Sequence, residues 1–392
     1  MLISITFIVF SGLLLGSICK KFKFPSLFGM VIAGILIGPH VLNLIDPSIL
    51  NISAEIRKIA LIIILIRAGL KLSIDDLKKV GRPAILMCFL PATCEVIGMI
   101  ILAPLLLGIS TLDAAILGAV IGAVSPAVIV PRMINLIDEK YGTDKSIPQM
   151  ILAGASVDDV YVIVLFTPFT ALATGGTVSV RSFVNIPISI VTGIVIGLIA
   201  GYLLVIYFNK FHMRDTIKVA MVLGVCFILT FLEDKFGSMI PFASLIAVMA
   251  LGLMIKRQKQ ELAVRLSAKY DKMWSIAEIF LFVLVGASVE INSLKTAGVS
   301  AVILIIAVLV FRMAGVFICM LGTKLTTKER LFSMLAYTPK ATVQAAIGGL
   351  PLAMGLACGN IVLTVSVIAI LLTAPLGAFA IDITYKKLLN HQ

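Results

Sequence analysis

Apolar residues fall in long runs along this chain, and short polar stretches separate the runs. A helix of about 20 apolar residues can cross a hydrocarbon core that is roughly 30 Å thick. The pattern therefore predicts an all-α polytopic membrane protein. It indicates about thirteen transmembrane helices, at residues 2–19, 26–45, 57–73, 83–107, 112–135, 148–172, 184–208, 217–232, 239–255, 274–291, 297–322, 329–354 and 359–383.

Composition supports this interpretation and narrows the functional classes. Hydrophobic residues make up 60% of the 392 residues and charged residues only 13%, whereas a soluble protein carries about 25% charged residues. The net charge of +12 does not indicate nucleic acid as a partner, because no basic cluster is interleaved with aromatic residues. The six cysteines lie in or beside apolar runs without CxxC spacing, so we interpret them as packing residues.

The distribution of Lys and Arg predicts how the chain is oriented. Of the 32 Lys and Arg residues, 24 lie in connections after odd-numbered spans, five lie on the opposite side and three lie within spans. Because cytoplasmic loops are enriched in Lys and Arg, we expect a multi-pass protein of the cell membrane with its N-terminus outside and its C-terminus in the cytoplasm. The first run lacks the basic start and the cleavage site of a signal peptide, so it is kept as the first span.

An odd number of spans suggests two inverted repeats of six helices, joined by the seventh span. The fifth member of each repeat is interrupted by proline, as GAVSPAVIVP in the first and AYTPKATVQAAIGGLP in the second. Proline removes a backbone N–H and clashes with the preceding turn, so both helices are expected to unwind; simple kinks are the alternative. Paired broken helices at corresponding positions indicate the midplane site of a transporter.

Two adjacent carboxylates, Asp158 and Asp159, lie in the apolar run after the first broken span. A charge at the centre of a membrane helix costs roughly 2.5–3.5 kcal/mol on insertion scales, which makes this pair a functional-site hypothesis. Neighbours on a helix are rotated by about 100°, so one can face a water-filled cavity while the other faces a neighbouring helix. Carboxylate, hydroxyl and carbonyl oxygens suit a hard cation, and Ser125, Thr338 and Ser156 are candidate helpers.

We interpret five other ionisable residues as intramembrane, namely Arg67, Glu95, Glu278, Arg312 and Lys340. Arg312 cannot deprotonate and needs an anion, for which Glu95 and Asp158 are candidates. We favour a permanent structural pair with Glu95, with Asp158 within reach. Lys340 can balance exposed carbonyl ends or the half-helix dipoles where the broken helices cross.

Five motifs carry a resemblance to a known family. They are FPSLFGMVIAGILIGP at 24–39, IRAGL at 66–70, AVSPAVIVPRM at 123–133, GASVDDV at 154–160 and TPKATVQAA at 338–346. Together they resemble the cation/proton antiporter superfamily, and most closely its NHA-type sodium/proton antiporter branch. The resemblance covers nearly the whole chain.

The resemblance implies an NhaA-like fold, with two inverted six-helix repeats and two broken crossing helices, in a homodimer. It implies that a core domain moves against a dimerisation panel as an elevator. Residues 1–73 and 217–292 would form the panel, residues 74–172 and 293–392 the ion-binding core, and residues 173–216 the bridging helix.

The resemblance also implies roles for individual residues. Asp159 would be the principal ligand of Na⁺ and Asp158 its partner, while Arg312 and Glu95 would hold the positions of a basic residue and the acid that pairs with it. Ser125 replaces an acidic residue that many relatives have in the first break, and Arg312 replaces a lysine. Stoichiometry stays open, because the carboxylate doublet suggests two protons per cation and the arginine suggests one.

We therefore expect a secondary antiporter, not an enzyme, that exchanges cytoplasmic Na⁺ or Li⁺ for external protons without a cofactor, with the bilayer and a second copy of the chain as partners. Proton and cation would compete for Asp159. The alternatives are a K⁺/H⁺ antiporter, an organic-anion symporter of similar fold and an intramembrane aspartyl protease. The protease needs carboxylates that converge on one water, whereas neighbours on one helix diverge, and the sequence contains no GxGD.

Overall fold

The structure is a computed structural model. It describes residues 1–71, 81–174, 180–236 and 242–392, and within these ranges it leaves out the side chains of residues 156, 160, 180–187, 234 and 291–297. The described backbone is helical apart from its connections, in which one isolated bridge joins Tyr141 to His391. The chain divides into two compact units.

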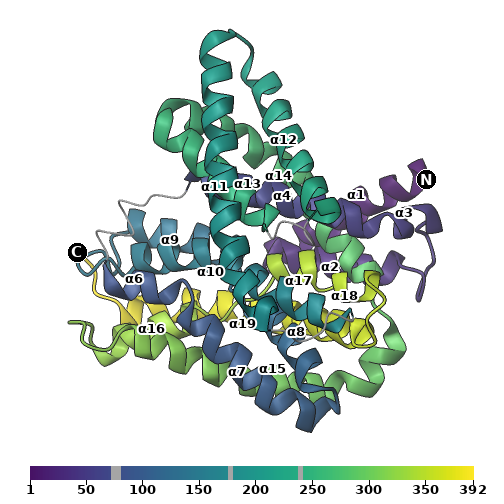
Figure 1. The fold of residues 1–392 in the computed structure, drawn as a ribbon. Helices are drawn as coiled ribbons and strands as arrows, with labels where there is room; N and C mark the ends of the chain where they lie inside the picture. The colour runs from purple at the N-terminus through teal and green to yellow at the C-terminus, as the bar shows by residue number, and fades with distance from the viewer. Residues whose placement is uncertain (72–80, 175–179, 237–241) are drawn as a thin grey trace. The chain divides into compact units, whose positions relative to one another are not determined.

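Unit 1 comprises Met1–Arg57, Ser73–Thr174 and Ile279–Gln392. Within it, α7 packs along α15, and α8 packs on α7, α10 and α19 (Figure 1). Its helices are α1 (Leu2–Lys21), α2 (Ser26–Ile37), α3 (Pro47–Asn51), α6 (Arg82–Met87), α7 (Leu90–Leu107), α8 (Thr111–Ile121), α9 (Pro126–Asp138), α10 (Ile147–Ala173), α15 (Ile291–Cys319), α16 (Thr327–Ala336), α17 (Thr342–Ile347), α18 (Leu350–Ala353) and α19 (Gly359–Leu388).

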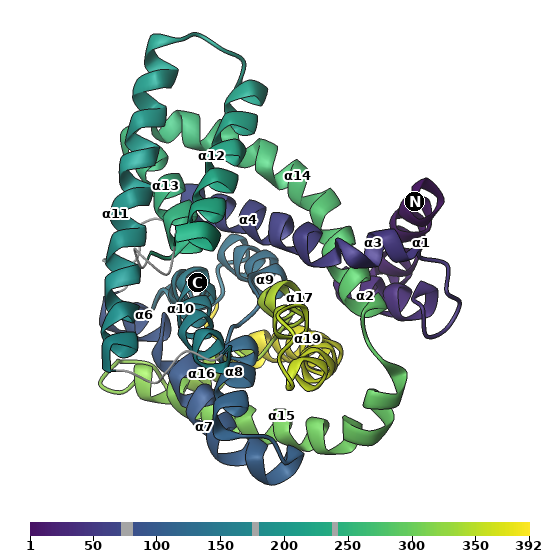
Figure 2. The same ribbon diagram turned by 45° about the vertical axis from the view of Figure 1, so that its right-hand side comes forward.

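Unit 2 comprises Lys58–Leu72 and Gly175–Glu278. It contains α11 (Val180–Lys210), α12 (Asp215–Phe236) and α13 (Ser244–Gln258), which pack against one another (Figure 2). Two helices contribute residues to both units: α4 (Ser53–Lys71) changes unit after Arg57, and α14 (Gln260–Ala287) changes unit after Glu278. The predicted division into panel, core and bridging helix stays a prediction.

Both spans that carry proline interruptions are divided in the structure. α8 ends at Ile121, and an extended linker leads to Pro126, the first residue of α9. α16 ends at Ala336, and α17 begins at Thr342 after a linker that contains Pro339. Because a proline at the start of a helix lacks a donor that would in any case be unbonded, Pro126 allows a new helix to begin inside the predicted span.

Glycines let the helices of unit 1 approach each other at backbone distance. A Cβ added at Gly34 of α2 would overlap the carbonyl oxygen of Val283 in α14, and one added at Gly286 would overlap the carbonyl oxygen of Val31. Small residues at such contacts are typical of membrane helices, because close packing replaces the hydrophobic driving force that is absent between helices in lipid.

Eight helical segments of the described chain are long and apolar enough to cross a membrane. Each of the thirteen predicted runs overlaps one or more of the described helices. Five of the predicted runs fall below that measure. α4 and α14 carry several charged residues, α2 and α13 have only 12 and 15 residues, and the run at 329–354 is divided into α16, α17 and α18. The chain is all-helical and multi-pass, whereas the count of thirteen and the inverted repeats stay predictions.

Candidate ion-binding site

The linkers of the two divided spans meet in the interior of unit 1. The backbone N–H of Ser125, at the end of the first linker, donates a hydrogen bond of 2.8 Å to the carbonyl oxygen of Pro339 in the second. Lys340 follows Pro339, and its own N–H donates to Thr373 Oγ1 in α19 at 2.9 Å. Unwound backbone is tolerated at membrane depth only where its polar groups are satisfied by protein or water, and here protein groups accept from both of these N–H donors.

Asp158 of α10 faces this crossing and is fully buried. Its Oδ2 accepts hydrogen bonds from the Val124 N–H and from Arg312 Nη2, each at 2.8 Å. The first contact fixes the linker between α8 and α9, and the second is a buried ion pair with α15. Asp158 therefore binds both the linker of the broken helix and the side chain of Arg312.

Asp159 is the next residue of α10 and has different surroundings. Its side chain is 7% exposed, and its Oδ1 is buried without a hydrogen-bond donor among the described residues. The rotation between neighbouring positions of a helix separates the two carboxylates as the sequence indicates. Asp158 is held through its Oδ2 by two protein donors, and the Oδ1 atoms of both carboxylates have no donor among the described residues.

Arg312 is the centre of a buried charge cluster. Its Nη1 lies 2.8 Å from Glu95 Oε2, and its Nη2 lies 2.8 Å from Asp158 Oδ2, so it pairs with both candidate acids. The same guanidinium donates to the carbonyl oxygen of Tyr337 at 2.6 Å and to that of Gly122. One side chain thus binds both linkers as well as two carboxylates.

Lys340 also contacts Glu95, with its Nζ 2.5 Å from Oε2. Two cations, Arg312 and Lys340, therefore face two anions, Glu95 and Asp158, and all four side chains are fully buried. Their formal charges cancel. An ionised Asp159 beside this cluster adds one negative charge that no described cation of the cluster contacts, and an uncompensated buried charge is costly.

Several buried oxygen atoms near the crossing have no hydrogen-bond donor among the described residues. They are Glu95 Oε1, Ser125 Oγ, Asp158 Oδ1, Asp159 Oδ1, Thr342 Oγ1 and Gln344 Oε1. Orphaned buried acceptors are rare and need an explanation such as an ion or a water molecule. Hydroxyl and carboxylate oxygens are ligands that hard cations prefer, so this oxygen-rich region is the candidate site.

The predicted helper residues are placed unequally. Ser125 is fully buried, and its hydroxyl has no hydrogen-bond partner among the described residues. Thr338 Oγ1 donates to the carbonyl oxygen of Leu335 at 2.8 Å and keeps its lone pairs available. Ser156 lies outside the residues whose side chains the structure describes. The structure thus brings Asp158, Arg312 and Glu95 into direct contact, and their roles in transport stay predictions.

Comparison with known proteins identifies the family. A model of the transmembrane sodium/hydrogen exchanger family matches residues 5–387 of the chain. The chain belongs to this family.

The relatives of this exchanger agree with its family, and a solved structure agrees with its fold. It is 34% identical to sodium/hydrogen exchanger 9B2 of Homo sapiens, over 93% of the chain and 70% of that protein. It is 32% identical to the 9B2 exchanger of Xenopus tropicalis, over 99% of the chain and 75% of that protein. The structure of the sodium proton antiporter MjNhaP1 from Methanocaldococcus jannaschii has a TM-score of 0.85 at 20% identity, over 99% of both chains, which supports the fold.

Gln344 is a polar residue of the exchanger's crossing that the sequence analysis did not single out. It lies in α17, is fully buried, and donates from Nε2 to three carbonyl oxygens of the first broken span. The signal was available, because Gln344 is an uncharged polar side chain within an apolar membrane segment, and such residues often bond between helices.

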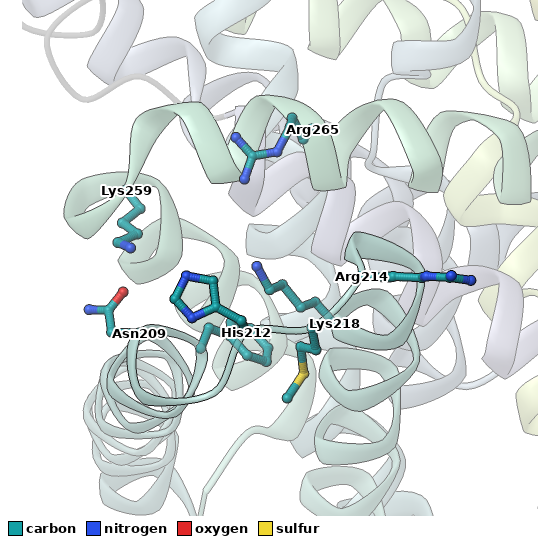
Figure 3. A pocket seen from close by; sticks show the side chains of 8 residues that line it. Asn209, His212, Arg214, Lys218, Lys259 and Arg265 are labelled. Carbon is teal, nitrogen blue, oxygen red and sulfur yellow. The ribbon is translucent and has the colours of Figure 1, made fainter.

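Unit 2 of the exchanger contains a cleft with a basic lining. It is a cleft of about 620 Å³, where α11 leads into α12 and α13 leads into α14. Its lining contains four cations and no carboxylate, so it is unsuited to a metal cation (Figure 3). The lining residues are Phe208, Asn209, His212, Met213, Arg214, Lys218, Lys259 and Arg265.

Proposed function

We propose that this chain is a secondary antiporter that exchanges Na⁺, or Li⁺, for protons, and that the proton and the cation compete for Asp159. Membership of the sodium/hydrogen exchanger family supports the exchange reaction. The observation that carries the assignment to Asp159 is the charge balance of the crossing. Glu95 and Asp158 are paired with Arg312 and Lys340, while Asp159 has no such partner among the described residues.

Competition follows from this balance. When Asp159 is ionised and empty, the buried site carries one uncompensated negative charge, and moving it through the membrane is costly. Either a proton or a monovalent cation restores neutrality. Only a loaded site therefore crosses readily, and the exchange is coupled without a separate gate.

We further propose a stoichiometry of one proton per cation. Arg312 cannot release a proton at any accessible pH, and it holds Asp158 in a buried pair. Lys340 is in turn engaged by Glu95. Asp159 is then the carboxyl group whose proton is exchanged, so one positive charge moves in each direction and the cycle is electrically neutral.

The mode of movement belongs to the same proposal. The ion-binding core would move as an elevator against a dimerisation panel within a homodimer of the cell membrane, with the N-terminus outside. The similarity to the MjNhaP1 structure supports the fold on which this proposal is built.

The test is exchange in proteoliposomes with an imposed pH gradient. Asp159→Asn should abolish Na⁺-dependent proton movement, because the amide cannot ionise. Asp113→Asn is the matched control, since Asp113 lies in the first turn of α8 beside Ser110, away from the charge cluster. Retained exchange in Asp159→Asn, in protein that is folded by size-exclusion chromatography, would contradict the proposal.

The same vesicles test ion selectivity and charge movement. Exchange with Na⁺, Li⁺ and K⁺ separates a sodium antiporter from a potassium antiporter. A membrane potential of 100 mV changes the energy of one moving charge by about 2.3 kcal/mol, so a two-proton cycle responds strongly to voltage. A one-for-one cycle should show the same rate with and without the potential.

A further inference from the structure

Gln344 connects the two broken helices at one defined point. From α17, its Nε2 lies 3.1 Å from the carbonyl oxygens of Val120 and Ile121 and 3.0 Å from that of Ala123. These oxygens belong to the last residues of α8 and to the linker that follows. The end of an α-helix leaves its last four carbonyl groups without partners inside the helix, so Gln344 acts as a cap supplied by another helix.

The orientation of the amide follows from its surroundings. Three carbonyl oxygens face one end of the Gln344 side chain, and carbonyl oxygens only accept hydrogen bonds. The NH₂ group must therefore be at that end, and its two hydrogens are shared among the three acceptors. Oε1 points the other way and is buried without a donor among the described residues.

The fourth carbonyl of this helix end is capped as well. Gly122 lies between Ile121 and Ala123, and its carbonyl oxygen accepts from Arg312 Nη1. Gln344 and Arg312 together satisfy four consecutive carbonyl groups, from Val120 to Ala123. The two caps come from different helices, α17 and α15, so the end of α8 is fixed from two sides.

This helix end determines where two site residues lie. The next residue, Val124, donates its N–H to Asp158, and the residue after it is Ser125, whose buried hydroxyl has no partner in the part of the chain that the structure describes. If the carbonyls of Val120 to Ala123 moved, both contacts would move with them. We propose that Gln344 is a positioning residue for cation binding, which holds the α8 end so that Ser125 and Asp158 keep their places beside Asp159. This inference rests on the proposed exchange of Na⁺ at Asp159.

The chemistry of glutamine suits this task. Its amide donates without adding a formal charge to a cluster whose charges already cancel. Methionine has a similar length and no donor, so Gln344→Met removes the cap with little change in volume. Asparagine keeps the donor on a side chain that is one methylene shorter. In Gln344→Asn the amide should therefore reach only some of the three carbonyl groups.

The experiment measures the Na⁺ dependence of exchange in proteoliposomes of the full chain. Gln344→Met should raise the apparent KM for Na⁺ by about tenfold or more, which corresponds to the loss of one or two net hydrogen bonds. The maximal rate should stay within about twofold of that of the unmodified protein, because saturating Na⁺ restores occupancy. Gln344→Asn should give an intermediate KM.

Ser366→Ala is the matched control. Ser366 is a fully buried residue of α19 whose hydroxyl donates to the carbonyl oxygen of Val362 in its own helix, and it packs against Gly348 at the end of α17. Its removal should lower the melting temperature without changing KM. A purely structural role of Gln344 would give the same result as this control.

The outcomes separate this inference from the proposed function. An unchanged KM in Gln344→Met, or a fall in maximal rate at constant KM, would overturn the positioning role while leaving exchange intact. If Gln344→Met does not fold, the KM of Gln344→Asn decides, since a value within twofold of the unmodified protein overturns the inference. Absence of Na⁺-dependent exchange in the unmodified protein would instead refute the proposed function itself.

Discussion

Replacing Arg312 by methionine is the most informative perturbation of the buried charge cluster. The change keeps much of the side-chain volume but removes four contacts at once. These are the ion pairs with Glu95 and Asp158 and the hydrogen bonds to the carbonyl oxygens of Tyr337 and Gly122. Glu95 keeps Lys340 as a partner, whereas Asp158 loses its ion-pair partner.

The expected loss of stability is large. Breaking a buried ion pair by removing one partner costs about 3–5 kcal/mol, because the other charge stays buried and unpaired. The two carbonyl groups that lose a donor add to this cost, at about 1–3 kcal/mol each if they stay buried. Arg312→Met should therefore lower the free energy of unfolding by at least about 3–5 kcal/mol.

The assay is thermal or denaturant unfolding of purified protein in detergent, with Arg132→Met as the control. Arg132 of α9 pairs with Asp382 of α19 at 3.0 Å, and the aspartate side chain is 46% exposed. Exposed pairs contribute roughly 0.2–1 kcal/mol. The double variant Arg312→Met with Asp158→Leu should recover part of the stability lost in the single variant, because it removes the unpaired carboxylate.

Two results would refute this reasoning. One is a loss in Arg312→Met that is no larger than the loss in Arg132→Met. The other is a double variant that is less stable than Arg312→Met alone, since an unpaired buried Asp158 would then not be the source of the cost.

Two further substitutions test other parts of the fold and can be measured in the same unfolding assay. Lys340→Met should destabilise the protein less than Arg312→Met, because Glu95 retains Arg312 as a partner when the lysine is removed. An equal or larger loss of unfolding free energy would show that the lysine stabilises the cluster more than the arginine does. Gly34→Ala should destabilise by about 1–3 kcal/mol, since its Cβ would overlap the carbonyl oxygen of Val283 and force the helices apart. Gly298→Ala is its control, because no atom of the described residues lies within 4 Å of the added Cβ. Equal stability of these two variants would contradict the close approach of α2 and α14.

The sequence predicted the broken helices because their cause is local. Proline has no N–H and a fixed φ. Pro126 and Pro339 therefore indicate an interruption of the helix whatever the helix packs against. The separate surroundings of Asp158 and Asp159 were predictable for the same reason, since the rotation between neighbours is a property of every α-helix. Charge within apolar runs likewise marked Glu95, Arg312 and Lys340 as residues that need partners.

Contacts between distant segments could not be derived in this way. From the sequence, both Glu95 and Asp158 were candidate partners of Arg312. In the structure, each of the two terminal nitrogens of Arg312 donates to one of these carboxylates. The contact of Lys340 with Glu95 joins residues 245 positions apart, and the three bonds of Gln344 join α17 to α8. Such contacts depend on how helices are placed in space, and hydrophobic patterning specifies only which face of a helix is apolar.

The most direct test of the central claim is the Na⁺ dependence of the exchange rate at a series of pH values in proteoliposomes. If a proton and Na⁺ compete for the carboxylate of Asp159, each fall of one pH unit in the acid range should raise the apparent KM for Na⁺ by about tenfold. The maximal rate at saturating Na⁺ should stay constant over the same range. An apparent KM that does not change with pH, together with a maximal rate that falls as protons are added, would show that the two ions do not share one site.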